Sequence, residues 1–138
     1  MSQSMASRRI AGISARCRND RPEEIGLLWE RFFREGVAQR VGGSGLYAVY
    51  FDYAGDHTAP YTLLIGAEVD ATAMLVDGIA DVSVEAGEYV PFDASGPQPQ
   101  SIYAAWGRIW QSGLDRAYRT DFETYGPDDA VTIYIGVR

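Results

Sequence analysis

The chain contains no lysine, one cysteine and one histidine among its 138 residues, and no apolar run long enough to cross a membrane. A single cysteine, Cys17, excludes an intrachain disulfide framework and a cysteine zinc site. The only histidine, His57, lies in the loop sequence AGDHTAP, where we interpret it as a turn residue rather than a ligand. We therefore expect neither a metal ion nor another cofactor.

Positive charge is scarce and unevenly placed. All twelve basic residues are arginine, eight of them lie within residues 8–40, none lies between residues 41 and 107, and the net charge is −7. Because phosphate contacts supply most of the affinity for nucleic acid, this composition argues against direct nucleic-acid binding. The N-terminal sequence MSQSMASRR lacks the apolar segment of a signal peptide. We expect a cytoplasmic protein without a membrane partner.

Two segments of the chain share one helical pattern. Residues 25–36 read IGLLWERFFREG and residues 102–113 read IYAAWGRIWQSG. Each places apolar residues at i, i+3, i+4, i+7 and i+8, which predicts an amphipathic helix. The tryptophan, the arginine two residues later and the closing glycine all recur at an offset of 77 residues. We expect Gly36 and Gly113 to end these helices, Asp20 to cap the first, and Pro22 and Pro99 to lie at their beginnings.

Strand patterns surround both predicted helices in the same order. RRIAGISAR precedes the first helix, and GLYAVYFDY and YTLLIGAEV follow it; GEYVPFDAS precedes the second, and RTDFETY and VTIYIGVR follow it. We interpret residues 36–45 as a flexible connector. The chain thus repeats a β-α-β-β unit, and we predict one α+β domain over residues 1–138 with halves of about 5–70 and 79–138. The expected architecture is an antiparallel sheet with two helices on one face and a pseudo-two-fold axis, with a small-molecule pocket between the halves.

The repeat is broken at one acidic residue. If Tyr53 is aligned with Tyr125, Glu123 stands opposite Phe51. Strand alternation places Glu123 and Tyr125 on one face and Phe122 on the other. Spacing alone leaves two alternatives, a solvated glutamate or one that faces a pocket. Aromatic residues make up 12% of the chain, and rings around a desolvated carboxylate suit an organic cation. We assign Trp29 and Phe32 to the core and leave Trp106 and Trp110 open between core and pocket.

Four segments together resemble a known family. YAVYFDYAGDHTAPYTLLIG, EYVPFDASGP, AAWGRIW and DFETYGPDD followed by VTIYIGV resemble the gyrase-inhibitor-like (GyrI-like) small-molecule-binding domains. This family includes effector-binding modules of AraC-type and MerR-type transcription regulators and integron-associated effector-binding proteins. The resemblance runs from about Arg9 to Val137 and implies two β-α-β-β units with a pocket between them. Family regulators carry a preceding helix-turn-helix domain, for which this chain has no room, so we expect a stand-alone member.

The resemblance also implies a set of site residues. Glu123, the acid of the F-E-x-Y segment, would form the anionic floor of the pocket, and Trp106 would lie on the second helix. The Y-x-x-Y-x-x-Y segment is complete as Tyr47, Tyr50 and Tyr53, and the Y-x-x-F segment as Tyr89 and Phe92. The ligand-binding residues that we predict are Glu123, Trp106, Tyr50, Tyr89, Phe92, Trp110 and Tyr125.

Three functions follow from this resemblance. The first is binding of a lipophilic cationic or aromatic small molecule, for sensing or sequestration in transcription regulation. The second is hydrolysis of reactive electrophiles, with Glu123 activating water and Tyr125 donating a hydrogen bond. The third is a gyrase-type protein-partner role, because residues 41–100 hold nine acids and no base and could mimic nucleic acid. The sequence leaves open a homodimer or a regulator partner.

Overall fold

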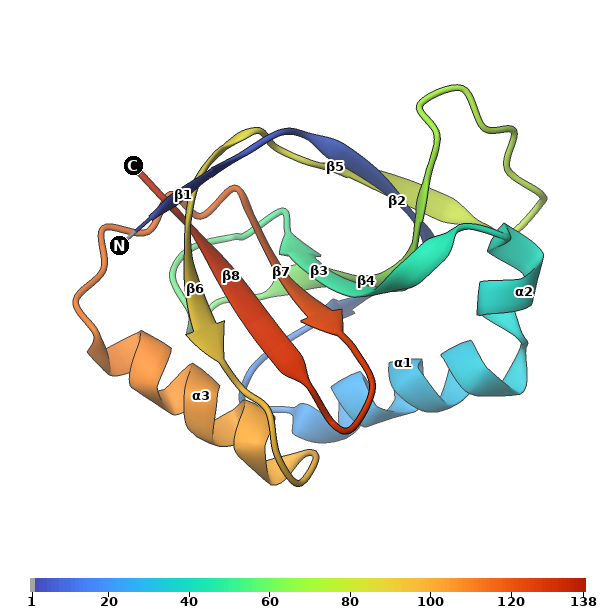
Figure 1. Cartoon of the computed structure of the whole chain (residues 1–138). Helices are drawn as coiled ribbons and strands as arrows, with labels where there is room; N and C mark the ends of the chain where they lie inside the picture. Colours follow the sequence, from blue (N-terminus) through green and yellow to red (C-terminus); the bar gives the residue numbers. More distant parts are fainter. Residues whose placement is uncertain (1) are drawn as a thin grey trace.

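The computed structural model describes residues 2–138, which form eight strands and three helices. The described elements follow the predicted β-α-β-β order twice, with additions at the edges (Figure 1). In chain order they are β1 (Gln3–Met5), β2 (Arg8–Cys17), α1 (Pro22–Arg34), α2 (Val37–Val41), β3 (Ser44–Phe51), β4 (Tyr61–Val69), β5 (Ala80–Val84), β6 (Gly87–Asp93), α3 (Gln100–Gln111), β7 (Thr120–Tyr125) and β8 (Val131–Val137).

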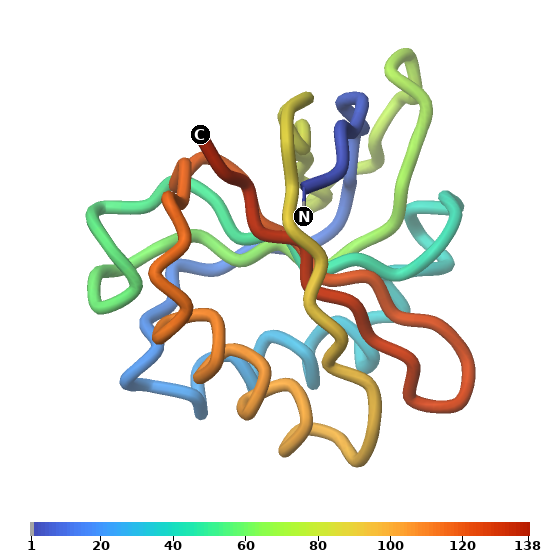
Figure 2. Tube along the Cα trace, turned by 60° about the vertical axis from the view of Figure 1, so that its left-hand side comes forward, coloured from blue at the N-terminus to red at the C-terminus, as the bar shows by residue number. Residues whose placement is uncertain are grey.

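The strands form one antiparallel sheet in the order β1-β6-β8-β7-β3-β4-β2-β5. β3 and β7, one from each unit, form the central pair of the sheet. β4 and then β2 follow outward from β3, and β8 and then β6 take the equivalent places outward from β7. Both α1 and α3 lie on the same side of the strands (Figures 1 and 2). The predicted α+β architecture with two duplicated units is therefore confirmed.

A two-stranded ribbon joins the two ends of the sheet. β1 and β2 follow each other in the chain, as do β5 and β6, and the two stretches pair antiparallel in a single register: Gln3 with Tyr89, Arg8 with Val84, and Gly12 with Ala80. The stretches arch side by side over the sheet (Figure 1). The sequence pattern did not predict β1 or β5, because each is short and most of its residues are exposed.

The predicted alignment of the two halves is wrong by one residue in β7. Val49 pairs with Phe122, and both side chains lie in the apolar cluster on the sheet face away from α1 and α3. Phe51 packs against that same cluster, whereas Glu123 lies on the opposite face. A pseudo-two-fold axis keeps equivalent side chains on one face, and a one-residue shift reverses the face. Glu123 therefore corresponds to Tyr50, and the axis passes through the Val49–Phe122 pair.

The ends of the helices differ partly from prediction. Gly36 and Gly113 follow α1 and α3 with φ of 60° and 72°, the left-handed backbone that favours glycine, as predicted. The predicted cap at Asp20 is wrong: the residue before α1 is Arg21, and the Asp20 carboxylate instead accepts hydrogen bonds from Arg18 at 2.9 and 3.1 Å.

The segment after α1 is also more ordered than predicted. Residues 36–45 include the short helix α2, so the interpretation as a flexible connector is wrong. Val37 is fully buried in the main core, and Val41 packs against that core. Residues four apart lie on one face of a helix, so Val37 and Val41 together turn the apolar face of α2 toward the core.

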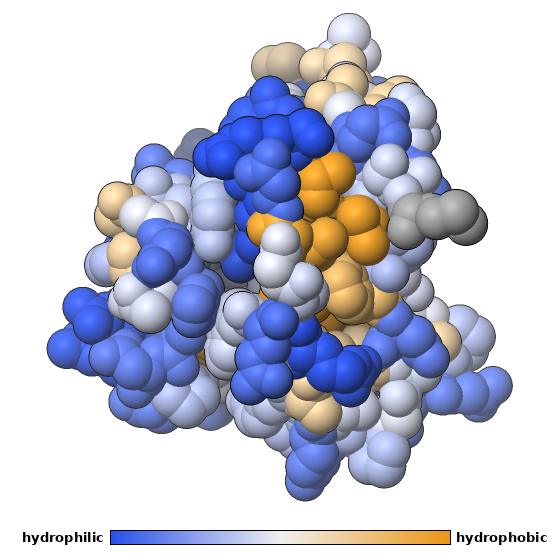
Figure 3. Space-filling model, turned by 90° about the vertical axis from the view of Figure 1, so that its left-hand side faces the viewer, coloured by the Kyte–Doolittle hydropathy of each residue, from blue (hydrophilic) through white to orange (hydrophobic). Residues whose placement is uncertain are grey.

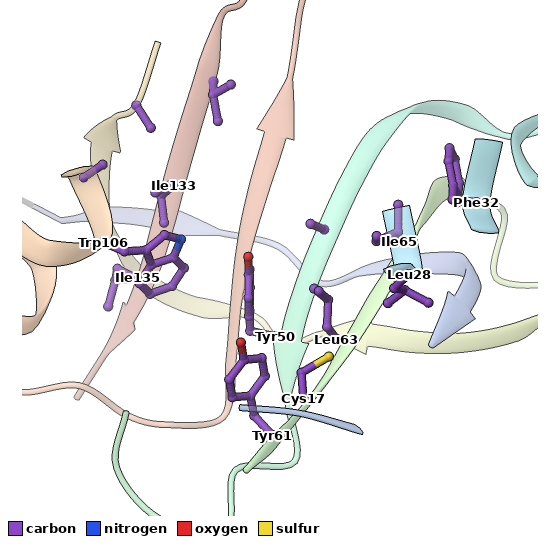
Figure 4. Close-up of a cluster of buried hydrophobic side chains, with 14 of the residues drawn as sticks. Cys17, Leu28, Phe32, Tyr50, Tyr61, Leu63, Ile65, Trp106, Ile133 and Ile135 are labelled. Atoms are coloured by element: carbon purple, nitrogen blue, oxygen red, sulfur yellow. The ribbon is translucent and has the colours of Figure 1, made fainter. Parts of the chain in front are cut away.

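Two apolar clusters lie on opposite faces of the sheet. The main core lies between the sheet and the helices and includes Leu28, Phe32, Ile65 and Ile133 (Figure 4). The outer cluster lies on the other face; its buried members are Ile10, Tyr47, Val49, Leu64, Val84, Tyr89 and Phe122. Each strand therefore alternates between two apolar environments, which explains why β3 and β4 read as nearly continuous apolar runs.

The surface is mostly hydrophilic on the face that Figure 3 shows, with one patch of apolar side chains bordered by polar ones. Large apolar side chains that are exposed include Leu27 and Met74, which belong to different parts of the chain. No helix within residues 2–138 has the length and apolar character needed to span a membrane.

Close contact between β2 and β4 makes a glycine essential. A Cβ atom on Gly66 would lie 1.9 Å from the Ala11 carbonyl oxygen, which belongs to the neighbouring backbone and cannot move aside alone. We expect Gly66→Ala to lower the free energy of unfolding by about 3 kcal/mol or more, at the upper end of overpacking effects. Urea denaturation followed by circular dichroism measures this change.

Gly107→Ala is the matched control. Gly107 lies within α3, and a Cβ atom there would meet no atom within 4 Å. This variant should be more stable than the wild type by about 0.5–1 kcal/mol, because alanine favours the helix. Equal effects of the two substitutions would contradict the assigned β2–β4 contact.

Candidate ligand-binding site

A cavity of about 620 Å³ lies between α1, α3 and the sheet. α1 contributes Ile25 and Trp29, α3 contributes Ile102 and Trp106, and the sheet contributes its floor. The helical repeat explains this placement, because Trp29 and Trp106 are equivalent residues on facing helices. The aromatic residues that line the cavity are Trp29, Phe33, Tyr50, Tyr53, Tyr61, Tyr103, Trp106, Trp110 and Tyr125.

Glu123 lies at the floor of the cavity, with only 1% of its surface exposed. Its Oε2 atom accepts hydrogen bonds from Tyr50 Oη at 2.9 Å and Trp106 Nε1 at 2.7 Å, and its Oε1 atom accepts one from Tyr125 Oη. All three donors are uncharged. Within residues 2–138, no arginine or histidine forms an ion pair with Glu123. The site is therefore a buried carboxylate that is hydrogen-bonded but not charge-compensated.

The strand register explains how Glu123 comes to face this space. Glu123 pairs across the sheet with Ala48, whose small side chain leaves room above the floor. Tyr50, its equivalent in the first half, lies on the same face and donates to it across the pseudo-two-fold axis. The Tyr50 and Trp106 rings lie 5.1 Å apart at 61°, an edge-to-face arrangement that Figure 4 shows beside Tyr61.

Two opposing effects set the pKa of the Glu123 carboxyl. Burial raises the pKa of Glu123 above its ordinary value of 4.5, and the hydrogen bonds from Tyr125, Trp106 and Tyr50 lower it by a smaller amount. Burial also raises the pKa of Tyr50 and Tyr125 well above 10, so both hydroxyls stay protonated and remain donors. A cation in the cavity would supply the missing charge partner and lower the pKa of Glu123.

A second buried carboxylate lies beside the first on β7. Asp121 is fully buried and accepts hydrogen bonds from Arg116 Nη2 at 2.7 Å, from Tyr53 Oη, and from the Gly136 backbone N–H at 2.7 Å. Arg116 lines the cavity and is itself 6% exposed. Asp121 and Arg116 thus form a compensated ion pair, in contrast to Glu123, and Arg116 is the member of the pair that lines the cavity.

The mouth of the cavity carries partly exposed rings. Phe33 on α1 and Tyr103 on α3 are 66% and 52% exposed, and Trp110 is 38% exposed. The ring of His57 stacks on Trp110, with centroids 5.3 Å apart and an angle of 18°. His57 therefore lies at the mouth, and the interpretation as a turn residue overlooked this contact.

Five of the seven predicted site residues line the cavity: Glu123, Trp106, Tyr50, Trp110 and Tyr125. Tyr89 and Phe92 do not. Residues three apart on a strand point to opposite faces, so the Y-x-x-F segment cannot place both rings in one pocket. Tyr89 lies in the outer cluster, 5.4 Å from the Phe122 ring, and donates to the Glu85 carbonyl. Phe92 packs against the main core without reaching the cavity.

The predicted set of ligand-binding residues left out Trp29, Tyr53, Tyr61 and Arg116, which also line the cavity. The repeat held a signal for Trp29, because it is the equivalent of Trp106 and had to lie on the facing wall. Tyr53 lies in the loop between β3 and β4, and Tyr61 is the first residue of β4. Arg116 lies in the irregular segment before β7, where no periodicity indicates the direction of a side chain. No group of three or more metal-binding side chains occurs in residues 2–138.

The fold and this cavity together define a duplicated α+β small-molecule-binding domain. Residues 4–137 match the family model described as integron-associated effector binding protein, named Cass2. The chain belongs to this family. No curated protein sequence matches the chain.

Solved structures share the fold over the whole chain. An integron cassette protein from the mobile metagenome of Vibrio cholerae is 27% identical, with a TM-score of 0.83, and the match covers 100% of this chain and 95% of that one. The protein SAV2435, solved bound to tetraphenylphosphonium, is 18% identical with a TM-score of 0.82, and the match covers 100% of this chain and 93% of that one. EcmrR, solved in a DNA complex, is 13% identical with a TM-score of 0.60, and 57% of that chain is covered.

Burial of Glu123 gives stability a distinct pH dependence. An acid whose pKa is raised by folding binds its proton more tightly in the folded state, so its contribution is fully present below 4.5 and is lost as the pH rises through the raised value. As the pH is lowered from 7 to 4, we expect the wild type to gain stability relative to Glu123→Gln. Urea denaturation of both proteins across this range measures the difference.

Glu30→Gln is the control, because it removes the same charge from the exposed face of α1. Its stability difference from the wild type should change much less with pH. A pH-independent difference between wild type and Glu123→Gln would show that burial does not raise the pKa of this carboxyl.

Proposed function

We propose that this protein binds lipophilic organic cations in the cavity between α1, α3 and the sheet, with Glu123 as the counter-ion. The observation that carries the proposal is a buried carboxylate, 1% exposed, that receives three uncharged donors and has no ion-pair partner within residues 2–138. An isolated buried charge is costly unless it is paired. A ligand with a delocalised positive charge would compensate Glu123 at the smallest desolvation cost.

The walls of the cavity fit the same ligand class. Ring faces attract cations, and each contact contributes about 0.5–2 kcal/mol depending on desolvation. The Trp29 and Tyr125 rings lie 5.1 Å apart, and Trp106 and Trp110 lie 6.3 Å apart, so aromatic surface surrounds the floor from both helices. Membership of the effector-binding family and the tetraphenylphosphonium bound to SAV2435 support this assignment.

The biological role that we infer is sensing or sequestration of such compounds within transcription regulation. The family model is described as an effector-binding protein, and EcmrR, whose structure was solved in a complex with DNA, shares the fold. The net charge of −7 disfavours direct contact of this chain with DNA, so a regulatory signal would pass through a partner protein.

The arrangement at Glu123 favours a counter-ion over a general base. Both carboxylate oxygens already accept hydrogen bonds, and their donors come from rigid rings. A base that activates water needs a free, well-oriented lone pair within about 3 Å of that water. Hydrolysis of an electrophile is therefore the alternative outcome of the test rather than the proposal.

The first test compares a cation with its neutral isostere. 1-Methyl-4-phenylpyridinium and 4-methylbiphenyl have the same shape and differ in charge, and tetraphenylphosphonium serves as a larger cation. We expect Glu123→Gln to weaken both cations at least tenfold, because removal of one partner from a buried charge pair costs about 2–5 kcal/mol. Binding of 4-methylbiphenyl should change less than threefold, as measured by quenching of tryptophan fluorescence.

Glu30→Gln is again the matched control and should bind all three probes like the wild type. Equal losses for the cation and the neutral isostere would contradict the counter-ion role. Turnover of a reactive epoxide by the wild type but not by Glu123→Gln, followed by mass spectrometry, would instead favour the hydrolase alternative.

The second test uses pH. Cation binding requires the ionised form of Glu123, whose pKa is raised by burial. The affinity for tetraphenylphosphonium should therefore fall as the pH is lowered through that pKa, and one proton should be released on binding when the free carboxyl is protonated. Isothermal titration calorimetry in buffers of different ionisation enthalpy measures both effects. In Glu123→Gln the affinity should be flat over the same range, and a parallel decline in both proteins would refute the assignment.

A further inference from the structure

Arg116 holds hydrogen-bond donors that no protein group uses. Of its guanidinium nitrogens, Nη2 donates to Asp121 at 2.7 Å, whereas neither Nε nor Nη1 donates to any group within residues 2–138. Nε is fully buried, so Nη1 is the donor that a ligand in the cavity can reach. A guanidinium that lines a cavity and has an unused, reachable donor can offer that donor to an acceptor on a ligand.

The guanidinium is held in one position by aromatic rings. Its Cζ atom lies 4.4 Å from the centroid of the Tyr118 ring, 5.8 Å from that of Tyr53 and 5.9 Å from that of Trp106. These rings and the bond to Asp121 restrict the side chain, which is 6% exposed. Because the Arg116 guanidinium is already held in place, its side chain loses little rotamer freedom when a ligand binds. Its N–H groups also point in fixed directions, so they favour a ligand whose acceptor lies in one of those directions.

Glu123 and Arg116 differ in charge compensation. Within residues 2–138, Glu123 has no ion-pair partner, whereas Arg116 is compensated by Asp121. Both lie against Trp106, because its Nε1 atom donates to Glu123 at 2.7 Å and its ring lies 5.9 Å from the Arg116 Cζ atom. A ligand of ordinary aromatic size would therefore reach both residues. Glu123 needs a positive charge, and Arg116 offers donors without a net charge to neutralise.

We propose that Arg116 forms a second subsite that accepts an uncharged oxygen acceptor, such as a ketone, ester or amide carbonyl, of the bound cation. This inference rests on the proposed cation-binding function and specifies its ligand class: cations that carry a carbonyl group rather than purely hydrocarbon cations. A carboxylate suits the subsite less well, because it would add a third negative charge close to Asp121 and Glu123.

The probes are three benzyltriphenylphosphonium ions that differ only in the 4-substituent: acetyl, isopropyl and carboxyl. Acetyl and isopropyl are nearly isosteric, so their affinity ratio isolates the carbonyl oxygen. A hydrogen bond from a charged donor supports a preference of about tenfold. We expect this ratio to fall about tenfold when the guanidinium is removed, and the carboxyl probe to bind the wild type more weakly than the acetyl probe.

The test variant carries two substitutions. Arg116→Met removes the guanidinium, and Asp121→Asn removes the carboxylate that would otherwise be left buried without its ion-pair partner. The matched control is Arg119→Met with Glu85→Gln, which removes an exposed ion pair of 3.8 Å and leaves the cavity intact. If the first variant fails to fold by circular dichroism, Arg116→Lys replaces it, because lysine keeps the charge beside Asp121 but lacks the planar fork. The control should show the wild-type ratio.

An unchanged acetyl-to-isopropyl ratio in the Arg116 variants, with tetraphenylphosphonium bound as in the wild type, would overturn this inference and leave the proposed function standing. Failure of the wild type to bind any phosphonium would overturn both. A carboxyl probe that binds as tightly as the acetyl probe would refute the preference for an uncharged acceptor.

Discussion

Pairing of β3 with β7 is the interaction on which the rest of the structure depends. Within residues 2–138, it is where the two β-α-β-β units meet in the interior of the sheet, with both helices on the same face. It also fixes Tyr50 and Glu123 beside the pseudo-two-fold axis, close enough for a hydrogen bond of 2.9 Å. A one-residue shift of this pairing would turn Glu123 toward the outer apolar cluster and away from the donors of Tyr50 and Trp106.

The two β-α-β-β units have nearly the same backbone arrangement, but the residues at the binding site differ between them. Trp29 and Trp106 occupy equivalent helical positions and form facing walls, whereas the equivalent strand positions hold Tyr50 in one half and Glu123 in the other. The same axis relates Ala48 to Asp121. Both carboxylates therefore lie in β7, and the equivalent positions of β3 hold a small side chain and a donor hydroxyl. Neither unit contains the site by itself, because the donors to Glu123 come from both.

Much of the fold could be read from the sequence, and the reasons for the failures are physical. Helical stripes, closing glycines and repeated strand order predicted both units, because periodicity reports which face of an element is buried. The same reasoning failed for α2, where one turn is held by tertiary packing of Val37 rather than by local preference. It failed for β1 and β5, whose backbone pairing leaves little trace in side-chain pattern.

The site was predictable to the extent that it lies on regular elements. Glu123, Trp106, Tyr50, Trp110 and Tyr125 lie on strands or a helix, and the structure brings all five to one cavity. Spacing alone could have shown that Tyr89 and Phe92 do not share one pocket wall, since residues 89 and 92 point to opposite faces of a strand. Arg116 could not be placed, because its direction depends on the irregular segment before β7 and on a partner, Asp121, whose own burial requires the complete sheet.

The ribbon of β1–β2 with β5–β6 has a consequence for synthesis of the protein. The edge of β2 is covered by β5, and β1 is paired only with β6, so the first unit needs strands that belong to the chain after residue 79. While the ribosome is still making residues 80–93, the emerging first half exposes an unpaired strand edge and an uncovered apolar face. The first half therefore lacks the strands that pair with β1, β2 and β3 until the corresponding parts of the second half have been made.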